Sequence, residues 1–414
     1  VGILYNTSSE NKKINLNQIE FVDKLIENKK YKTEDIKDIL SATNSTQEDI
    51  NSSQIELFSR LDKKGNFDIK DIISILFGTK TNEIEINRAQ NEFLNELLNN
   101  KKINNKNIGD ILIATNSTDE EVNTNQIAFF NELFKKCYKD EDISGILYYT
   151  NSNNKNVNTQ QISFVKNLIK NSNFDNQDIS NILKTIRFSN MSLFLSEENF
   201  NTEDIALKQI ALATELTKNN RFSTDEINKI FSDTISVDKD INLRQLDLAI
   251  ELVKNTDFDT KEIKDILHST TAKSKNITLN QITFAINLIK NNDFTSKETK
   301  DLLLTTRADD DDINSAKIFL VNNLIGKNRF DTEDIKNIVF SATSDNKKIN
   351  SNQISLVLEL LKNEKFNGED IALISYATKS DNEKINSSQV EFARELIENK
   401  NFNGDNIWNI LYYG

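Results

Sequence analysis

The pentapeptide Ile50-Asn51-Ser52-Ser53-Gln54 returns unchanged at residues 385–389 of this 414-residue chain. Looser copies begin at Ile14, Val122 and Ile349. The closing glutamine marks a period of mostly 36 residues, with lysine in its place once: Gln18, Gln54, Gln90, Gln126, Gln161, Gln209, Gln245, Gln281, Lys317, Gln353 and Gln389. A fixed period of this length is typical of tandem repeat proteins.

Each copy of the period predicts two helices. A leucine stands seven residues after every marker, and apolar residues such as Ile19, Val22 and Leu25 surround it at helical spacing, which predicts an amphipathic first helix. This helix is expected to end near an asparagine such as Asn28, ten residues past the marker. An aromatic residue follows, and then a shorter second helix that ends near a threonine.

Two short helices cannot bury their apolar faces alone, so neighbouring repeats must stack. The sequence therefore predicts an all-α fold, an α-solenoid of eleven two-helix repeats of about 36 residues, and we expect a right-handed superhelix. The period and helix count resemble those of tetratricopeptide, HEAT-like and TAL-effector arrays. Their signature residues are missing and the chain has no proline, so no family is assigned.

The recurring Asn-x-x-Gln spacing predicts a capping box at the start of each first helix. The predicted caps are Asn15, Gln18, Asn51, Gln54, Asn123, Gln126, Asn350, Gln353, Asn386 and Gln389. An alternative is that the glutamines form a ladder that grips an extended ligand. Second helices carry their own predicted boxes, at Ser223 with Glu226, Asp259 with Glu262, Thr295 with Glu298 and Asp331 with Asp334.

The period breaks once, between Gln161 and Gln209, where the step is 48 residues. This predicts an N-terminal block of repeats at 1–186, an insertion or irregular repeat at 187–204, and a C-terminal block at 205–414. This repeat is expected to be either a hybrid or one that carries an extra short helix at Met191 to Ser196, in either a degenerate seam or a functional site. Both ends of the chain read as parts of second helices, so we expect a piece of a longer array, with head-to-tail assembly as the alternative.

The net charge of −13 repels phosphate and argues against nucleic acid as a partner. No run of about 18 or more apolar residues occurs, so no membrane span is expected, nor is a signal peptide, and the segment is expected to be soluble. The single cysteine, Cys137, cannot form an intramolecular disulfide and is interpreted as a small buried or half-buried hydrophobic residue.

Catalytic, cofactor-binding and metal-binding residues are not predicted, and the chain is not expected to be an enzyme. The single histidine, His268, leaves no dyad or metal cluster, and it reads as a packing or surface residue. The acidic run Asp309 to Asp312 lacks the spacing of a calcium loop. Its position before a predicted helix favours an interaction with the helix dipole.

Two columns are candidate partner-binding surfaces. The acidic column lies six residues after the marker, and aromatic residues recur near the ends of the second helices. The candidate residues are Glu96, Glu132, Glu215, Glu251, Glu359, Glu395, Tyr148 and Tyr376. The alternatives are a solvated face for the acids and stacking against the next repeat for the aromatics.

The leading hypothesis is a non-catalytic scaffold that binds a protein or peptide, and a basic one suits the charge. A modular nucleic-acid reader is one alternative, although no repeat position supplies a continuous Lys/Arg row. A fibre or surface-layer subunit that assembles head to tail is another.

Overall fold

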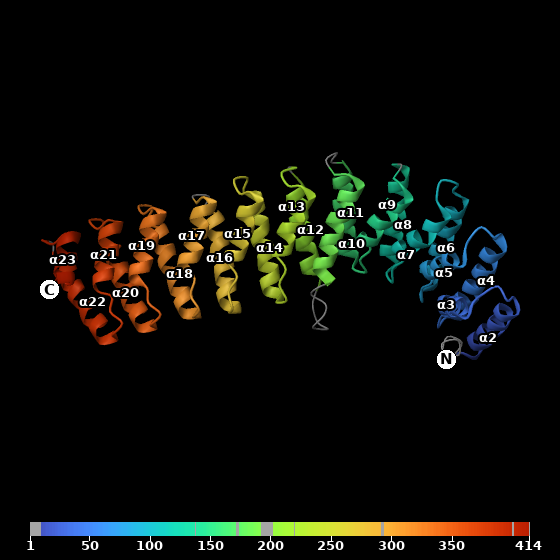
Figure 1. Cartoon of the computed structure of the whole chain (residues 1–414), viewed down its shortest axis with the longest axis horizontal. Helices are drawn as coiled ribbons and strands as arrows, with labels where there is room; N and C mark the ends of the chain where they lie inside the picture. Colours follow the sequence, from blue (N-terminus) through green and yellow to red (C-terminus); the bar gives the residue numbers. More distant parts are fainter. Residues whose placement is uncertain are drawn as a thin grey trace. The chain divides into compact units, whose positions relative to one another are not determined.

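A computed structural model describes residues 10–136, 138–170, 174–191, 202–218, 220–290, 294–399 and 401–413. These residues are 77% helical, with 22 helices and no strand among them (Figure 1). The predicted all-α fold of eleven two-helix repeats is confirmed.

The first helices of the repeats are 14 to 17 residues long. They are α2 (Lys12–Glu27), α4 (Glu48–Lys64), α6 (Ile84–Asn99), α8 (Glu120–Lys135), α10 (Lys155–Lys170), α12 (Thr202–Lys218), α14 (Lys239–Lys254), α16 (Lys275–Lys290), α18 (Asp311–Ile325), α20 (Lys347–Leu360) and α22 (Glu383–Glu398).

The second helices are shorter, except α11. They are α3 (Thr33–Thr43), α5 (Ile69–Thr79), α7 (Asn105–Thr115), α9 (Asp140–Thr150), α11 (Asn176–Met191), α13 (Thr224–Asp233), α15 (Thr260–Ser269), α17 (Ser296–Thr306), α19 (Thr332–Ala342), α21 (Gly368–Ala377) and α23 (Gly404–Tyr413).

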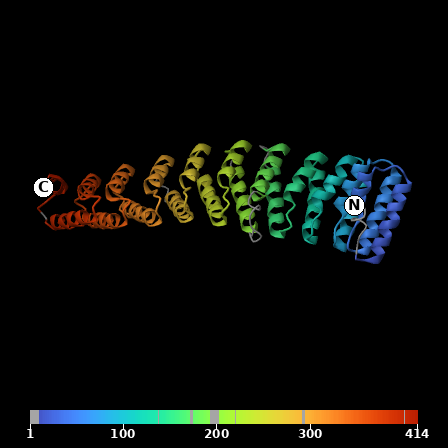
Figure 2. The ribbon, with the colours of Figure 1, turned by 60° about the horizontal axis from the view of Figure 1, so that its bottom comes forward.

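The described residues divide into two compact units, and the division falls inside α12. The first unit contains residues 10–191 and 202–210, and the second begins at residue 211. Within each unit the helical hairpins follow one another in chain order (Figure 2). Within a unit, first helices pack beside the first helices of neighbouring repeats, as α14, α16 and α18 illustrate, and second helices do the same, as α5, α7 and α9 illustrate.

The core runs through every repeat. All eleven leucines seven residues after the marker are at most 8% exposed: Leu25, Leu61, Leu97, Leu133, Leu168, Leu216, Leu252, Leu288, Leu324, Leu360 and Leu396. Burying a leucine side chain stabilises a fold by about 1.5–3 kcal/mol. Stacking of repeats therefore supplies the hydrophobic stabilisation that an isolated hairpin lacks.

A buried ladder of amides replaces the predicted first-helix capping boxes. Helix α4 begins at Glu48 after the N-cap Gln47, so Asn51 lies one turn inside it. The Asn51 amide donates to the backbone carbonyl of Thr43, at the end of the preceding second helix. Seven such bonds span 2.8–3.1 Å: Asn51 to Thr43, Asn87 to Thr79, Asn123 to Thr115, Asn158 to Thr150, Asn242 to Thr234, Asn314 to Thr306 and Asn386 to Thr378.

The glutamines point the other way, toward the second helix of their own repeat. Gln54 Nε2 donates to the Thr79 hydroxyl at 3.0 Å. Seven bonds of this kind span 3.0–3.3 Å: Gln18 to Thr43, Gln54 to Thr79, Gln90 to Thr115, Gln126 to Thr150, Gln245 to Thr270, Gln281 to Thr306 and Gln353 to Thr378. These glutamines are buried, so they cannot reach a ligand at the surface.

The capping prediction for the first helices was therefore wrong. Its residues lie inside helices: Asn15, Gln18, Asn51, Gln54, Asn123, Gln126, Asn350, Gln353, Asn386 and Gln389. The reason is geometric. The asparagine and the glutamine of each repeat are three positions apart, so they lie on nearly the same side of the helix, and this side faces neighbouring helices instead of the helix N-terminus. The side chains that do cap first helices stand four residues before the asparagine column: Asn11, Asp119, Asp238, Asp310, Asn346 and Asn382.

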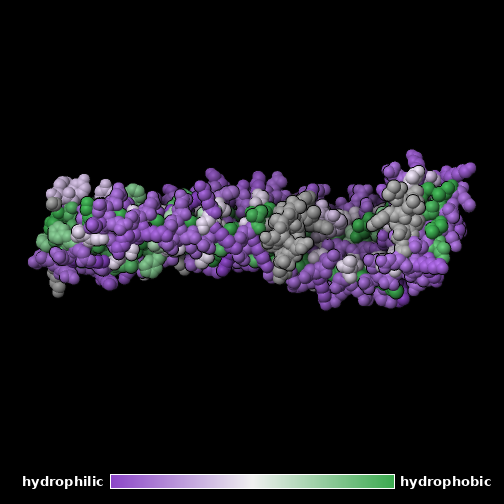
Figure 3. Space-filling model, turned by 90° about the horizontal axis from the view of Figure 1, so that it is seen from below, coloured by the Kyte–Doolittle hydropathy of each residue, from purple (hydrophilic) through white to green (hydrophobic). Residues whose placement is uncertain are grey.

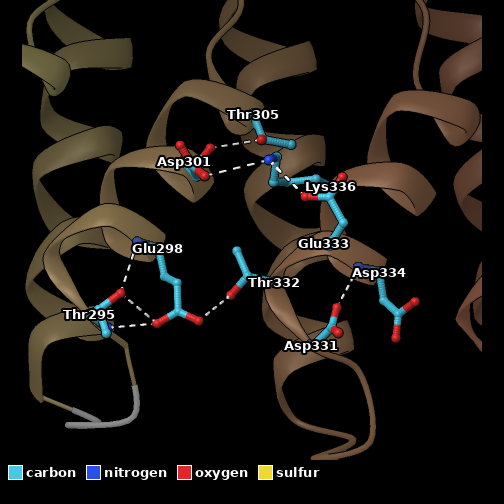
Figure 4. Close-up of polar contacts among 9 residues, drawn as sticks. All are labelled: Thr295, Glu298, Asp301, Thr305, Asp331, Thr332, Glu333, Asp334 and Lys336. Carbon is cyan, nitrogen blue, oxygen red and sulfur yellow. Dashed lines mark hydrogen bonds and ion pairs between the residues drawn. The ribbon is translucent and has the colours of Figure 1, made fainter.

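The predicted boxes of the second helices are confirmed at Ser223, Asp259 and Thr295, each with its glutamate, and Asp331 accepts from the Asp334 N–H. Figure 4 shows that the Thr295 box also joins two repeats. Glu298 bonds Thr295 and accepts a hydrogen bond from the Thr332 hydroxyl of the next repeat at 3.2 Å.

Two predictions fall on other parts of the chain. Cys137 lies outside the described residues, as do residues 192–201, which hold most of the predicted insertion. Of the predicted short helix from Met191 to Ser196, only Met191 is described, and it ends α11.

Candidate interaction surface

Apolar side chains stand exposed at one repeat position of the second helices, 23 residues after most markers. We call this set the apolar column. It comprises Phe77, Ile113 and Tyr148 in the first unit, and Leu304, Phe340, Tyr376 and Tyr412 in the second. Their exposed fractions run from 40% to 72%, and in the six members that a further repeat follows, all but Tyr412, stacking against that repeat does not bury the side chain. The aromatic residues of this column were identified from the sequence, but Ile113 and Leu304 were missed. Both stand 23 residues after their marker, so the repeat spacing would have identified them.

Helix geometry explains why these side chains point outward. Ile374 in α21 and Thr378, the C-cap of this helix, are buried. Tyr376 lies two residues from each of them, roughly 200° around the helix axis, and therefore on the opposite side. The same arrangement recurs at Phe77, Ile113, Tyr148, Leu304 and Phe340, where the residues two before and two after are buried.

In the first unit a hollow of about 610 Å³ lies beside the column, lined by Phe77, Ile113, Lys80, Glu83, Asn116 and Thr118. The loops around it are tied to the preceding repeat. Lys80 Nζ donates to the Ser41 carbonyl at 2.7 Å, and Asn116 donates to the Lys80 carbonyl at 2.8 Å. Burial lowers the pKa of the Lys80 amine. Side chains that line the hollow are therefore hydrogen-bonded to backbone carbonyls of the preceding repeat.

The predicted acidic column lies on the first helices, and four of its six members are engaged in ion pairs. Glu132 pairs with Lys166 at 2.8 Å and Glu359 with Arg394 at 2.9 Å. Two further pairs are Glu215 with Lys218 and Glu251 with Lys254. Glu96 and Glu395 are exposed.

Glu132 of the acidic column and Phe77 of the apolar column line different hollows. A hollow of about 350 Å³ that includes Glu132 is lined by first-helix residues such as Phe129, Ile162 and Lys166. The hollow beside Phe77 is lined by second helices and loops. On the face drawn in Figure 3, hydrophilic residues predominate and hydrophobic residues form separate patches.

The residues considered for chemistry in the sequence make contacts with nearby side chains and helix ends. His268 is exposed, and its Nε2 lies 3.4 Å from Asp233 Oδ1. Asp310 caps α18 as the helix-dipole interpretation predicts, and a hydrogen bond from Lys347 lowers its pKa. Asp311 accepts from Ser274 of the preceding repeat at 2.7 Å. Within the described part of the chain, no group of three or more His, Cys, Asp or Glu side chains is placed to hold a metal ion.

In the ninth repeat both positions of the Gln–Thr pair carry other residues. Lys317 occupies the glutamine position of α18, and Ala342 occupies the threonine position that a glutamine there would reach. Lys317 Nζ donates instead to the Arg307 carbonyl at 3.3 Å, and burial lowers the pKa of this amine. Compared with the other repeats, this one therefore lacks both the glutamine and the threonine of the pair.

The helices described here include none that is long and apolar enough to cross a membrane. Comparison with known proteins finds no match: no family model, no curated protein and no solved structure is significantly similar to this chain. Proposals about function therefore depend on the geometry alone.

Proposed function

We propose that this chain is a non-catalytic helical-repeat scaffold that binds a protein or peptide partner along the apolar column. The observation that carries the proposal is the recurrence of exposed Phe, Tyr, Ile and Leu side chains at one position of successive second helices. Large apolar and aromatic side chains are the groups that anchor protein interfaces.

The surroundings of the column favour a protein ligand over nucleic acid. Lys80 and Lys379 lie next to column residues, but their amines donate to backbone carbonyls of their own chain. A phosphate backbone requires a row of accessible cations. The net charge of −13 adds long-range repulsion.

Site-specific photo-crosslinking tests this function. A photoreactive amino acid replaces Tyr148 in the first unit or Tyr376 in the second, and control chains carry it at the exposed first-helix positions Thr124 or Thr283. In extracts of the source cells, we expect one protein to crosslink from the column positions and not from the controls. The neighbouring changes Ile113→Ser and Phe340→Ser should each weaken the crosslink in their own unit.

Three results would contradict the proposal. The first is equal crosslinking from column and control positions. The second is salt-dependent binding of single-stranded nucleic acid by the purified chain, which supports a modular reader. The third is concentration-dependent filaments in light scattering that persist in the column variants, which supports a fibre subunit.

A further inference from the structure

Helices α19, α21 and α23 combine the apolar column with acidic side chains on both sides of it. Phe340, Tyr376 and Tyr412 supply the column here. Glu333 lies seven residues before Phe340, two helical turns away and on the same helix face. Glu369 and Asp405 occupy the same position relative to Tyr376 and Tyr412, and all three acids are exposed.

The second acidic row lies beyond the other end of the helices. Asp345 and Asp381 are exposed in the loops that follow α19 and α21, each five residues after its column residue. The apolar row thus lies between two rows of carboxylates. We call this surface of α19, α21 and α23 the acidic–aromatic face.

The combination is confined to these helices of the second unit. At the position of Glu333 and Glu369, the preceding helices α15 and α17 carry Lys261 and Lys297. The charge at this position therefore changes sign between α17 and α19, while the apolar column continues from Leu304 to Phe340. A partner whose cationic side chains require carboxylates opposite them would bind the surface of α19, α21 and α23. It would not bind α15 and α17, where lysines occupy the same position.

Two amines of the chain lie on this face, against five carboxylates. Lys336 Nζ is 3.0 Å from Glu333 and 3.5 Å from Asp301 of the preceding repeat, as Figure 4 shows. Lys379 Nζ donates to the Phe340 carbonyl at 3.1 Å and lies 5.4 Å from the centre of the Phe340 ring. The Phe340 ring thus already holds an ammonium group of the chain itself, so the carboxylates, and not this ring, are the groups that would attract a cationic ligand here.

The spacing of the column selects the conformation of a ligand. Packed helices lie about 8–10 Å apart, so successive column residues are separated by about that distance. An extended polyproline II segment advances roughly 9 Å in three residues, which gives one anchor for each repeat. An α-helix presents an apolar side chain at each turn of about 5.4 Å, so half of its stripe would meet no column residue.

Such a segment also has three side-chain rows, because polyproline II has three residues per turn. When every third residue faces the apolar row, the other two rows point to either side, toward the two rows of carboxylates. We infer that the acidic–aromatic face binds an extended cationic segment of a partner protein, with an apolar residue at every third position and Lys or Arg between. This inference rests on the proposed function, because it assigns a ligand class to the same column.

Fluorescence anisotropy with the full chain tests the inference. The probe is a labelled nonapeptide of three Phe-Lys-Arg units. A second peptide of the same composition has its three Phe residues adjacent, and a third replaces Lys and Arg by Glu. We expect the first peptide to bind at least tenfold more tightly than the second, and the acidic peptide not to bind.

Matched variants locate the site. Glu369→Lys combined with Asp381→Lys reverses two charges on the face, and we expect at least a tenfold loss of affinity. Glu395→Lys combined with Glu398→Lys makes the same change in net charge on α22, outside the face, and should change affinity less than twofold. Tyr376→Ser should also weaken binding at least fivefold, with unfolding temperatures confirming that each variant is folded.

Equal binding of the two cationic peptides, or an equal loss in the α22 variant, would overturn the inference, because binding would then follow net charge alone. Failure of the peptide to bind would also overturn it. Crosslinking from Tyr148 and Tyr376 does not depend on ligand charge, so it would still stand if only the assigned ligand class were wrong. Loss of both results would remove the proposed function as well.

Discussion

Gln54 and Thr79 meet inside the second repeat, where Gln54 Nε2 donates to the Thr79 hydroxyl at 3.0 Å and neither residue is exposed. The backbone carbonyl of the same threonine accepts from Asn87 of the next repeat at 2.8 Å. Thr79 is therefore bonded from both sides, within its repeat and across to its neighbour. Buried amides of this kind are costly unless they are satisfied, so they favour a single register of stacking.

Removing the hydroxyl at this position should destabilise the array. Thr79→Val keeps the shape but leaves Gln54 Nε2 buried without its partner, at a cost of about 1–3 kcal/mol in the free energy of unfolding. Thr79→Ser keeps the hydroxyl and should cost less. Urea unfolding followed by circular dichroism measures both, and equal stability of the valine variant and the parent would contradict the role of the ladder.

Restoring the missing pair in the ninth repeat should reveal coupling. Lys317→Gln and Ala342→Thr recreate the sequence spacing at which other repeats form the Gln–Thr bond. We expect the double variant to be more stable than the sum of the single variants by about 1 kcal/mol, the net value of one buried hydrogen bond. A double-mutant cycle in urea measures this coupling, and strict additivity would mean that the two positions do not interact.

Glycines at one repeat position should respond oppositely to substitution. A Cβ added at Gly109 in α7 would lie 2.2 Å from Ser74 Oγ, whereas at Gly145 in α9 the nearest atom is Ser180 Oγ at 3.8 Å. Gly109→Ala should therefore destabilise the fold by about 1–3 kcal/mol through overpacking. Gly145→Ala should stabilise it by up to about 1 kcal/mol through helix propensity. Thermal unfolding measures the change in unfolding temperature for each variant. A change of the same sign in both would contradict the tight packing of α5 against α7.

The capping glutamates predict a loss of stability in acid. Hydrogen bonds from Thr295, first from its hydroxyl and then from its N–H, lower the pKa of Glu298 below its ordinary value of 4.5. A depressed carboxylate pKa contributes stability above the unfolded value, and this contribution is lost as the pH falls through the folded value. Glu298→Gln should therefore flatten the stability profile below about pH 5. An unchanged acid slope in this variant would contradict the contribution of the box.

The sequence predicted contacts within one turn of the second helices correctly, but it did not predict the contacts between residues far apart in the chain. The second-helix boxes, such as Thr295 with Glu298, were predicted correctly because both partners lie within one turn. Asn51 and Gln54 have the same spacing, yet they bond residues 8 and 25 positions away. The recurring threonine 25 residues after most markers was the available signal, and it was read only as a helix end.

The candidate surface was predicted in part for a similar reason. The register located Tyr148 and Tyr376 near the ends of the second helices, but exposure depends on the neighbouring helix, which one repeat does not specify. The acidic column was found on the first helices, and its pairing with residues such as Arg394 of the next repeat followed only from the stacked structure.

The most direct test of the proposed function separates folding from binding at the apolar column. Phe340, Tyr376 and Tyr412 are replaced together by serine. Both the free energy of unfolding and crosslinking of the partner are measured, the latter from a photoreactive group at Asn337, an exposed position of α19 about one turn before Phe340. We predict a change in stability of at most about 1 kcal/mol, as expected for exposed positions, with loss of the crosslink. Destabilisation by several kcal/mol with the crosslink preserved would show that the column serves packing and not binding.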